Sequence, residues 1–192
     1  MALAKLNSFS KESGFSLVEV MVATGLLATA IVTLAQLFAL STQTNVASRS
    51  TTYASVLAEQ KIEELRALAW GFDTQGLALS DTTTNTTVSP QTPTGGKGLS
   101  PSSSASLQEN TPGFVDYVDA YGNKLGTGEN PPDNAIYIRR WSITPLPTNP
   151  NNTLVIQVLV TRHRTRGAAD QGAVGRLPDE ARVITVRTRK AQ

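Results

Sequence analysis

Residues 14–40 read GFSLVEVMVATGLLATAIVTLAQLFAL, and this stretch decides the fold. Its only charged residue is Glu19, and the run from Val20 to Leu40 carries no charge. About 20 apolar residues in a helix cross the hydrocarbon layer of a membrane, so the stretch predicts one membrane-spanning helix. A carboxylate costs about 2.5–3.5 kcal/mol at the centre of a bilayer and less near its edge, so we expect Glu19 to have a partner.

Three ordinary interpretations compete for this segment. A secretory signal peptide has a short apolar core closed by a small-x-small cleavage site, whereas this run is longer and no such site closes it. A simple signal anchor explains the length and the basic residues Lys5 and Lys11, but not Glu19 or the Gly14–Phe15 junction. A buried helix of a soluble domain rarely runs this far without a charge.

The order Gly14-Phe15-Ser16-Leu17-Val18-Glu19, followed by a long apolar helix, resembles the leader and amino-terminal segment of type IV prepilins. The resemblance implies that a prepilin peptidase cuts between Gly14 and Phe15 and removes the leader, residues 1–14. It also implies methylation of the new amino terminus on Phe15. Glu19 would then pair with the Phe15 amine of a neighbouring pilin and set the axial register of a filament.

Charge predicts the topology and the location. Lys5 and Lys11 precede the span, and Arg49 is the first basic residue after it. The positive-inside rule therefore favours a single pass with the amino terminus in the cytoplasm and the bulk of the chain outside. The resemblance implies that the membrane crossed is the inner membrane. After processing, the resemblance implies a place in a pilus, at the cell surface or in the periplasm.

The helix is expected to continue beyond the membrane half, residues 15–40, into an amphipathic half, residues 41–70. Spacings of three and four place one group of residues on a single helical stripe. That group is Ala54, Ala58, Ile62, Leu65 and Ala69. Lys61 and Glu64 fall on other faces as an i,i+3 pair, as do Glu63 and Arg66, and Gly71 predicts the end of the helix.

The remainder predicts a loop and a β-rich head. Residues 71–113 are rich in Ser, Thr, Pro and Gly, a composition typical of an exposed connection. The head, residues 114–192, contains four strand-like runs at 114–121, 135–145, 153–162 and 182–189, with a bulge expected near Arg139–Arg140. The predicted fold class is α+β and pilin-like, with a long amino-terminal helix packed on a four-stranded antiparallel sheet.

Residue types for chemistry are scarce. The chain has no cysteine and one histidine, His163, which leaves no Cys/His nucleophile or zinc site. Asp116, Asp119 and Asn123 miss the spacing of an EF-hand and suit turn or strand-end roles better. We therefore predict no catalytic, cofactor-binding or metal site, and a protein that is not an enzyme.

Basic residues concentrate toward the end of the chain. From Arg139 onward there are ten basic and three acidic residues, a net charge of +7, against seven basic and twelve acidic residues before it, a net charge of −5. Six arginines are candidates for one positive face that meets DNA phosphates or an acidic neighbouring subunit. They are Arg162, Arg164, Arg166, Arg182, Arg187 and Arg189. A solvated edge that discourages strand pairing explains the same charges.

The functional expectation follows from the resemblance. Many major type IV pilins close their carboxy-terminal region with a disulfide, and this chain has no cysteine. The unbroken helix and residues 58–63 look more like a PilV-type minor pilin, a structural subunit that primes or joins a pilus for adhesion, motility or DNA uptake. The alternatives are a pseudopilin of a type II secretion system and, from another class, a signal-anchored binding domain that does not polymerise.

Overall fold

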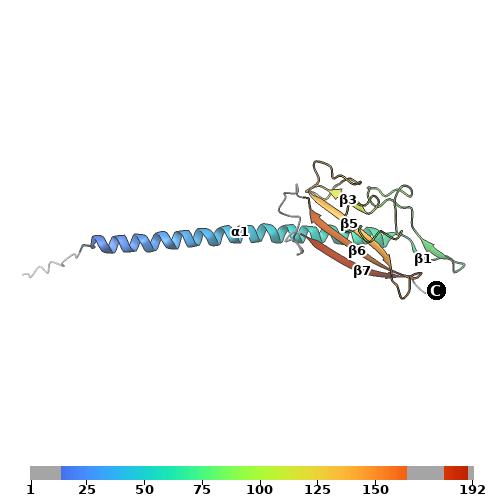
Figure 1. Ribbon diagram of the computed structural model, residues 1–192, viewed down its shortest axis with the longest axis horizontal. Coiled ribbons are helices and arrows are strands. Elements are labelled where there is room, and N and C mark those ends of the chain that lie inside the picture. Colours follow the sequence, from blue (N-terminus) through green and yellow to red (C-terminus); the bar gives the residue numbers. More distant parts are fainter. Residues whose placement is uncertain (1–13, 164–179, 190–192) are drawn as a thin grey trace, which may run out of the picture. The chain divides into compact units, whose positions relative to one another are not determined.

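The computed structural model describes residues 14–163 and 180–189 (Figure 1). The leader up to residue 13, and Arg164 and Arg166, lie outside the described residues. The chain divides into two compact units, Met1–Asn45 and Val46–Gln192. Helix α1, Leu17–Ala67, begins in the first unit and ends in the second.

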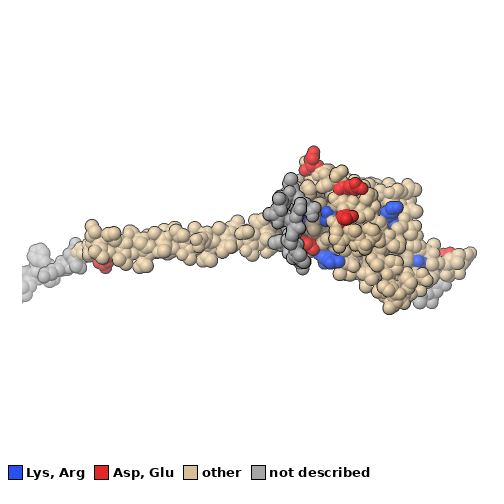
Figure 2. All heavy atoms as spheres, viewed as in Figure 1, with Lys and Arg blue, Asp and Glu red and all other residues tan. Residues whose placement is uncertain are grey.

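In the first unit, α1 exposes every described side chain. Its threonine hydroxyls are bonded within the helix, because Thr24 donates to the Val20 carbonyl at 2.8 Å and Thr29 donates to the Gly25 carbonyl at 2.6 Å. Figure 2 shows this part of the helix without acidic or basic atoms apart from one acidic side chain near its start. By length and composition the helix could cross a membrane.

In the second unit, α1 packs on the sheet through one face, as Figure 1 shows. Ala54, Ala58, Ile62 and Leu65 are buried, as the apolar stripe predicts. The stripe ends earlier than expected, because the helix stops at Ala67 and Ala69 is exposed. The expectation for Lys61 is wrong, since this lysine lies on the buried face with its side chain fully covered.

The main sheet has five strands in the order β4-β3-β5-β6-β7, and all its neighbours are antiparallel. The strands are β3 Val115–Val118, β4 Lys124–Gly126, β5 Tyr137–Pro145, β6 Thr153–Arg162 and β7 Ala181–Thr188. The four predicted runs correspond to β3, β5, β6 and β7. The predicted number of four is wrong because β4 has three residues, too few to display an alternating pattern.

The bulge predicted near Arg139–Arg140 is also wrong. Strands β5 and β6 pair without a break from Tyr137↔Arg162 to Pro145↔Leu154. The apolar pattern seemed to change phase because Arg139 occupies an inward position between Tyr137 and Trp141, where an apolar residue was expected. The irregularity in this sheet lies instead in the pairing of β3 with β4, between Tyr117 and Val118.

The core lies between α1 and the inward face of the sheet. Trp141 is fully buried there and meets Phe114 edge-on, with ring centroids 6.4 Å apart. A second, smaller cluster of buried residues occupies the other face at β3 and β5. Its members are Val115, Tyr117, Ala135 and Ile138.

The segment 71–113 is more ordered than its composition predicts. It contributes to a hairpin formed by β1, Trp70–Phe72, and β2, Ala78–Ser80. Farther along, Leu99 is buried in the main core and donates its backbone N–H to the Asp81 carbonyl at 2.7 Å. Backbone bonds of this kind, such as that from Ser102 to the Ile143 carbonyl at 2.9 Å, attach the segment to the sheet.

Candidate functional site

The cleavage and assembly residues of the resemblance stand at the start of α1. Gly14 and Phe15 precede the first helical residue, Leu17, and Phe15 is 82% exposed. Glu19 lies in the first turn, where the helix dipole favours a negative charge. The Gly14–Phe15 bond therefore lies in exposed, non-helical backbone, and the acidic group follows it within one turn.

Charge is otherwise absent from this part of the helix. Between residues 14 and 45, Glu19 is the only acidic or basic residue. Large apolar side chains such as Leu27, Ile31 and Phe38 are more than half exposed along the same stretch of helix. A surface of this kind is suited to lipid or to other apolar helices, and a lone carboxylate on it calls for a positive partner.

Two of the candidate arginines support the end of α1. Arg187 donates to the carbonyls of Leu65 at 3.1 Å and Leu68 at 2.6 Å. The last carbonyls of a helix have no partner within the helix, so a guanidinium at this position both bonds them and complements the helix dipole. Partial burial, with a smaller contribution from nearby Arg66, lowers the pKa of Arg187.

Arg189 fixes the β1–β2 hairpin next to this helix end. Its Nη1 donates to the carbonyls of Gly71 and Leu79, each at 3.2 Å. Its guanidinium also lies 3.7 Å from the centre of the Trp70 ring, in cation–π geometry. The guanidinium charge of Arg189 therefore makes both of these contacts within the protein and not with a partner.

The described arginines do not share one face. Along β7, Arg182 alternates with Arg187, so the two side chains leave opposite faces of the strand. Arg182 is exposed and donates to the amide oxygen of Gln157, and Arg162 is exposed at the end of β6. Contact with an anionic partner stays a prediction for these two, while Arg164 and Arg166 lie outside the described residues.

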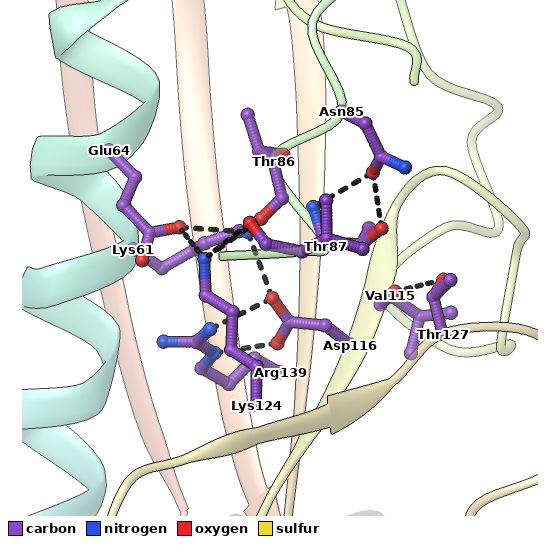
Figure 3. Close-up of polar contacts among 11 residues, drawn as sticks. Lys61, Glu64, Asn85, Thr86, Thr87, Val115, Asp116, Lys124, Thr127 and Arg139 are labelled. Atoms are coloured by element: carbon purple, nitrogen blue, oxygen red, sulfur yellow. Dashed lines mark hydrogen bonds and ion pairs between the residues drawn. The ribbon is translucent and has the colours of Figure 1, made fainter. Parts of the chain in front are cut away.

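A buried group of charges that the sequence reasoning missed lies between α1 and the sheet (Figure 3). Asp116 is at its centre, fully buried, on β3 directly opposite Arg139 on β5. Arg139 binds both carboxylate oxygens, Nε to Oδ1 at 2.6 Å and Nη2 to Oδ2 at 2.8 Å. Lys61, also fully buried, reaches Oδ2 from α1 at 2.9 Å.

The group extends toward the surface through a second carboxylate. Glu64 Oε2 lies 3.1 Å from Lys61 Nζ and 3.0 Å from Lys124 Nζ. The carbonyl of Thr86 accepts hydrogen bonds from both amines. Three cations and two carboxylates thus share one site, and it borders a polar cleft lined by Gln60, Glu64 and Lys124.

Burial and neighbouring charges act together on the two central groups. Burial lowers the pKa of Lys61, with Arg139 adding to this effect, while Asp116 and Glu64 oppose it. Burial alone would raise the pKa of Asp116, but the charges of Lys61 and Arg139 and their hydrogen bonds outweigh it and lower that pKa. In the resting state Asp116 is therefore an ionised carboxylate.

The turn or strand-end role predicted for Asp116 is wrong, because this residue lies inside β3 and binds Lys61 and Arg139, whereas Asp119 has the predicted local role. Asp119 accepts hydrogen bonds from the backbone of Tyr121 at 2.8 Å and of Asn123 at 2.9 Å, which confirms its role in a turn. Within residues 14–163 and 180–189, no cluster of three or more His, Cys, Asp and Glu is arranged to hold a metal ion.

Comparison with family models, characterised proteins and solved structures finds no match to the chain. The exposed apolar helix with its acidic first turn and the buried charged group are therefore the two features from which function can be argued. The first is an exposed apolar surface, and the second lies within the fold of the second unit.

Proposed function

We propose that this chain is a minor type IV pilin, a structural subunit that prepilin peptidase processes and that then primes or joins a pilus. The observation that carries the proposal is the start of α1, where an exposed Gly14–Phe15 bond is followed within one turn by Glu19 and then by an uncharged helical surface. The proposal places the chain in the inner membrane first, amino terminus in the cytoplasm. The filament then removes the helix from lipid.

Assembly would depend on two charges that meet in an apolar environment. Processing creates a positive amine on Phe15, and Glu19 supplies the negative partner in the next subunit. Leaving one member of a buried ion pair unpartnered costs about 3–5 kcal/mol, so a subunit held in the wrong axial register is strongly disfavoured. The surrounding apolar side chains supply contact area, and the ion pair supplies the register.

A type II secretion pseudopilin would use the same start of α1 and differ in the pilins it contacts. A signal-anchored binding domain would keep its leader and need no partner for Glu19. Removal of the leader distinguishes the two filament subunits from the signal-anchored domain. The pilins that the subunit contacts then distinguish a pseudopilin from a minor pilin.

The test is the intact mass of the full chain from cells with and without prepilin peptidase. When the peptidase is present, we expect the chain to lack residues 1–14 and to carry an added methyl group on Phe15. Without the peptidase, we expect neither change. An uncut chain in both strains overturns the proposal and leaves a plain anchor. Gly14→Val should block the cut, whereas Gly25→Val, at an open position on the helix, should not.

Assembly is tested separately on processed chain. Glu19→Gln should leave processing intact and abolish recovery of the subunit in sheared pili. If the subunit appears in secretion pseudopili and not in pili, the pseudopilin alternative replaces the pilus assignment.

A further inference from the structure

Lys61 and Asp116 meet in a place from which water is excluded. The side chains come from α1 and β3, 55 positions apart, and neither is exposed at all. Lys61 Nζ lies 2.9 Å from Asp116 Oδ2, and the Trp141 ring covers the amine at 4.0 Å. An amine and a carboxyl group are therefore held together within a dry, aromatic-walled site.

A second carboxylate contacts the same amine. Glu64 Oε2 is 3.1 Å from Lys61 Nζ, and the Glu64 side chain is 17% exposed at the edge of the polar cleft. Figure 3 shows Glu64 on the helix side of the amine and Asp116 on the sheet side. One carboxyl group is thus placed as an acceptor of protons and the other as the group to be attacked.

We propose that Lys61 and Asp116 join in an intramolecular isopeptide bond, with Glu64 carrying the proton. The amine of Lys61 attacks Cγ of Asp116, one C–O bond of the carboxyl group breaks, and an amide bond forms. Before the attack, the Lys61 ammonium passes one proton to Asp116, which gives a neutral amine and a carboxylic acid. Glu64 then accepts a second proton from the attacking nitrogen and returns it to the departing hydroxyl group, which leaves as water. No oxidant and no second substrate takes part, and Glu64 ends as it began. The proposal does not rest on the function proposed above.

Proximity and burial favour the reaction. Groups held in a productive arrangement react as though present at effective concentrations of about 10⁵–10⁸ M. Burial lowers the pKa of Lys61 and so favours the neutral, nucleophilic amine. Formation of the amide removes the buried charges of Lys61 and Asp116, and it leaves Arg139 with an amide oxygen in place of a carboxylate, which offsets part of this gain.

Arg139 has two opposing effects. Its bonds to both oxygens of Asp116 keep the carboxyl group ionised, which slows the attack because the carboxylate must gain a proton first. The same guanidinium is in place to stabilise the negative oxygen that develops on Asp116 when the C–N bond forms. We therefore expect the bond to accumulate slowly after folding instead of during it.

The link would join α1 to the sheet in a chain that has no cysteine. Its formation would need no oxidising compartment, unlike a disulfide. The bond would then keep the second half of α1 attached to β3 under mechanical force and in denaturant.

The test is the mass of the full, detergent-solubilised chain, freshly purified and after prolonged incubation under native conditions. We expect the parent chain to lose the mass of one water molecule with time, and Lys61→Arg to lose none. Trypsin should then release residues 50–66 joined to residues 98–124. Glu64→Gln should slow the loss at least tenfold, while Glu63→Gln, a change of the adjacent exposed glutamate, should not.

The parent chain alone can overturn the proposal, so the result does not depend on whether a variant folds. If the incubated chain keeps the mass of the unlinked sequence and retains the native tryptophan fluorescence, Lys61, Glu64 and Asp116 form ion pairs only, and the proposal is wrong. Loss of water from a different pair of peptides would also overturn the assignment. Leader removal changes the mass by residues 1–14, so failure of processing and failure of the cross-link are told apart in one spectrum.

Discussion

Replacing Arg187 by Gln tests whether the arginines of β7 act inside the fold or toward a partner. The change removes two hydrogen bonds from a charged donor to the carbonyls of Leu65 and Leu68. Hydrogen bonds to charged groups contribute about 1.5–3 kcal/mol each when buried. Arg187 is only partly covered, so solvent screening reduces the sum, and we expect a loss of about 2 kcal/mol.

The assay is urea unfolding of the full chain in detergent micelles, followed by the fluorescence of Trp70 and Trp141. With a urea dependence of about 2 kcal/mol/M, the midpoint should fall by roughly 1 M. Arg182→Gln is the matched control, because Arg182 is exposed on the opposite face of the same strand and should change the free energy of unfolding by less than about 0.5 kcal/mol.

The reasoning is refuted if the two variants have equal midpoints. It is refuted in the other direction if Arg187→Gln leaves stability unchanged and lowers salt-sensitive binding to DNA. That result would place Arg187 on a partner-facing surface.

Three further variants examine the packing and the turns of the second unit. Leu65→Ala opens a cavity at a fully buried position and should lower the free energy of unfolding in urea by about 2–5 kcal/mol. A loss as small as that of a change at an exposed site would contradict the packing. Gly122→Ala, at φ +87°, should cost about 1–2 kcal/mol because a side chain is strained there, whereas Gly71→Ala should be tolerated in the same assay. Hydrogen bonds from Asn123 and neighbouring backbone lower the pKa of Asp119, so its contribution is present above its unfolded pKa and is lost as pH falls through the folded one. Asp119→Ala should therefore be less stable than the parent at neutral pH, and in a pH series of thermal melts the difference should begin to shrink only below about pH 4, the unfolded pKa, and vanish once the pH lies below the lowered folded pKa.

The long elements were predictable from the sequence, because each repeats its pattern many times. The apolar face of α1 at Ala54, Ala58 and Ile62 and the nearly continuous apolar run of β6 both predicted their burial. Strand β4 was missed because three residues carry no period. The start of α1 was expected from the resemblance, and its role in processing and assembly stays a prediction.

The buried charges could not be predicted from a pattern that assigns lysine and arginine to the surface. Lys61 lies on the inward stripe of α1, and the carboxylates of Asp116 and Glu64 make its burial tolerable. Charged residues within apolar runs, Asp116 in β3 and Arg139 in β5, were the signal available. Recognising it required the pairing of those strands, which depends on contacts distant in sequence.

The bonds from Arg187 to the end of α1 have a consequence for synthesis of the protein. Arg187 and the Leu65 carbonyl are 122 positions apart, so the helix end has no guanidinium until almost the whole described chain has emerged. Until then, carbonyls at the end of α1 and the backbone edge of β6 that pairs with β7 face solvent. The nascent head is therefore a substrate for proteases and chaperones up to the arrival of β7. A ribosome that stops before β7 would release a chain that quality control can recognise by this open helix end.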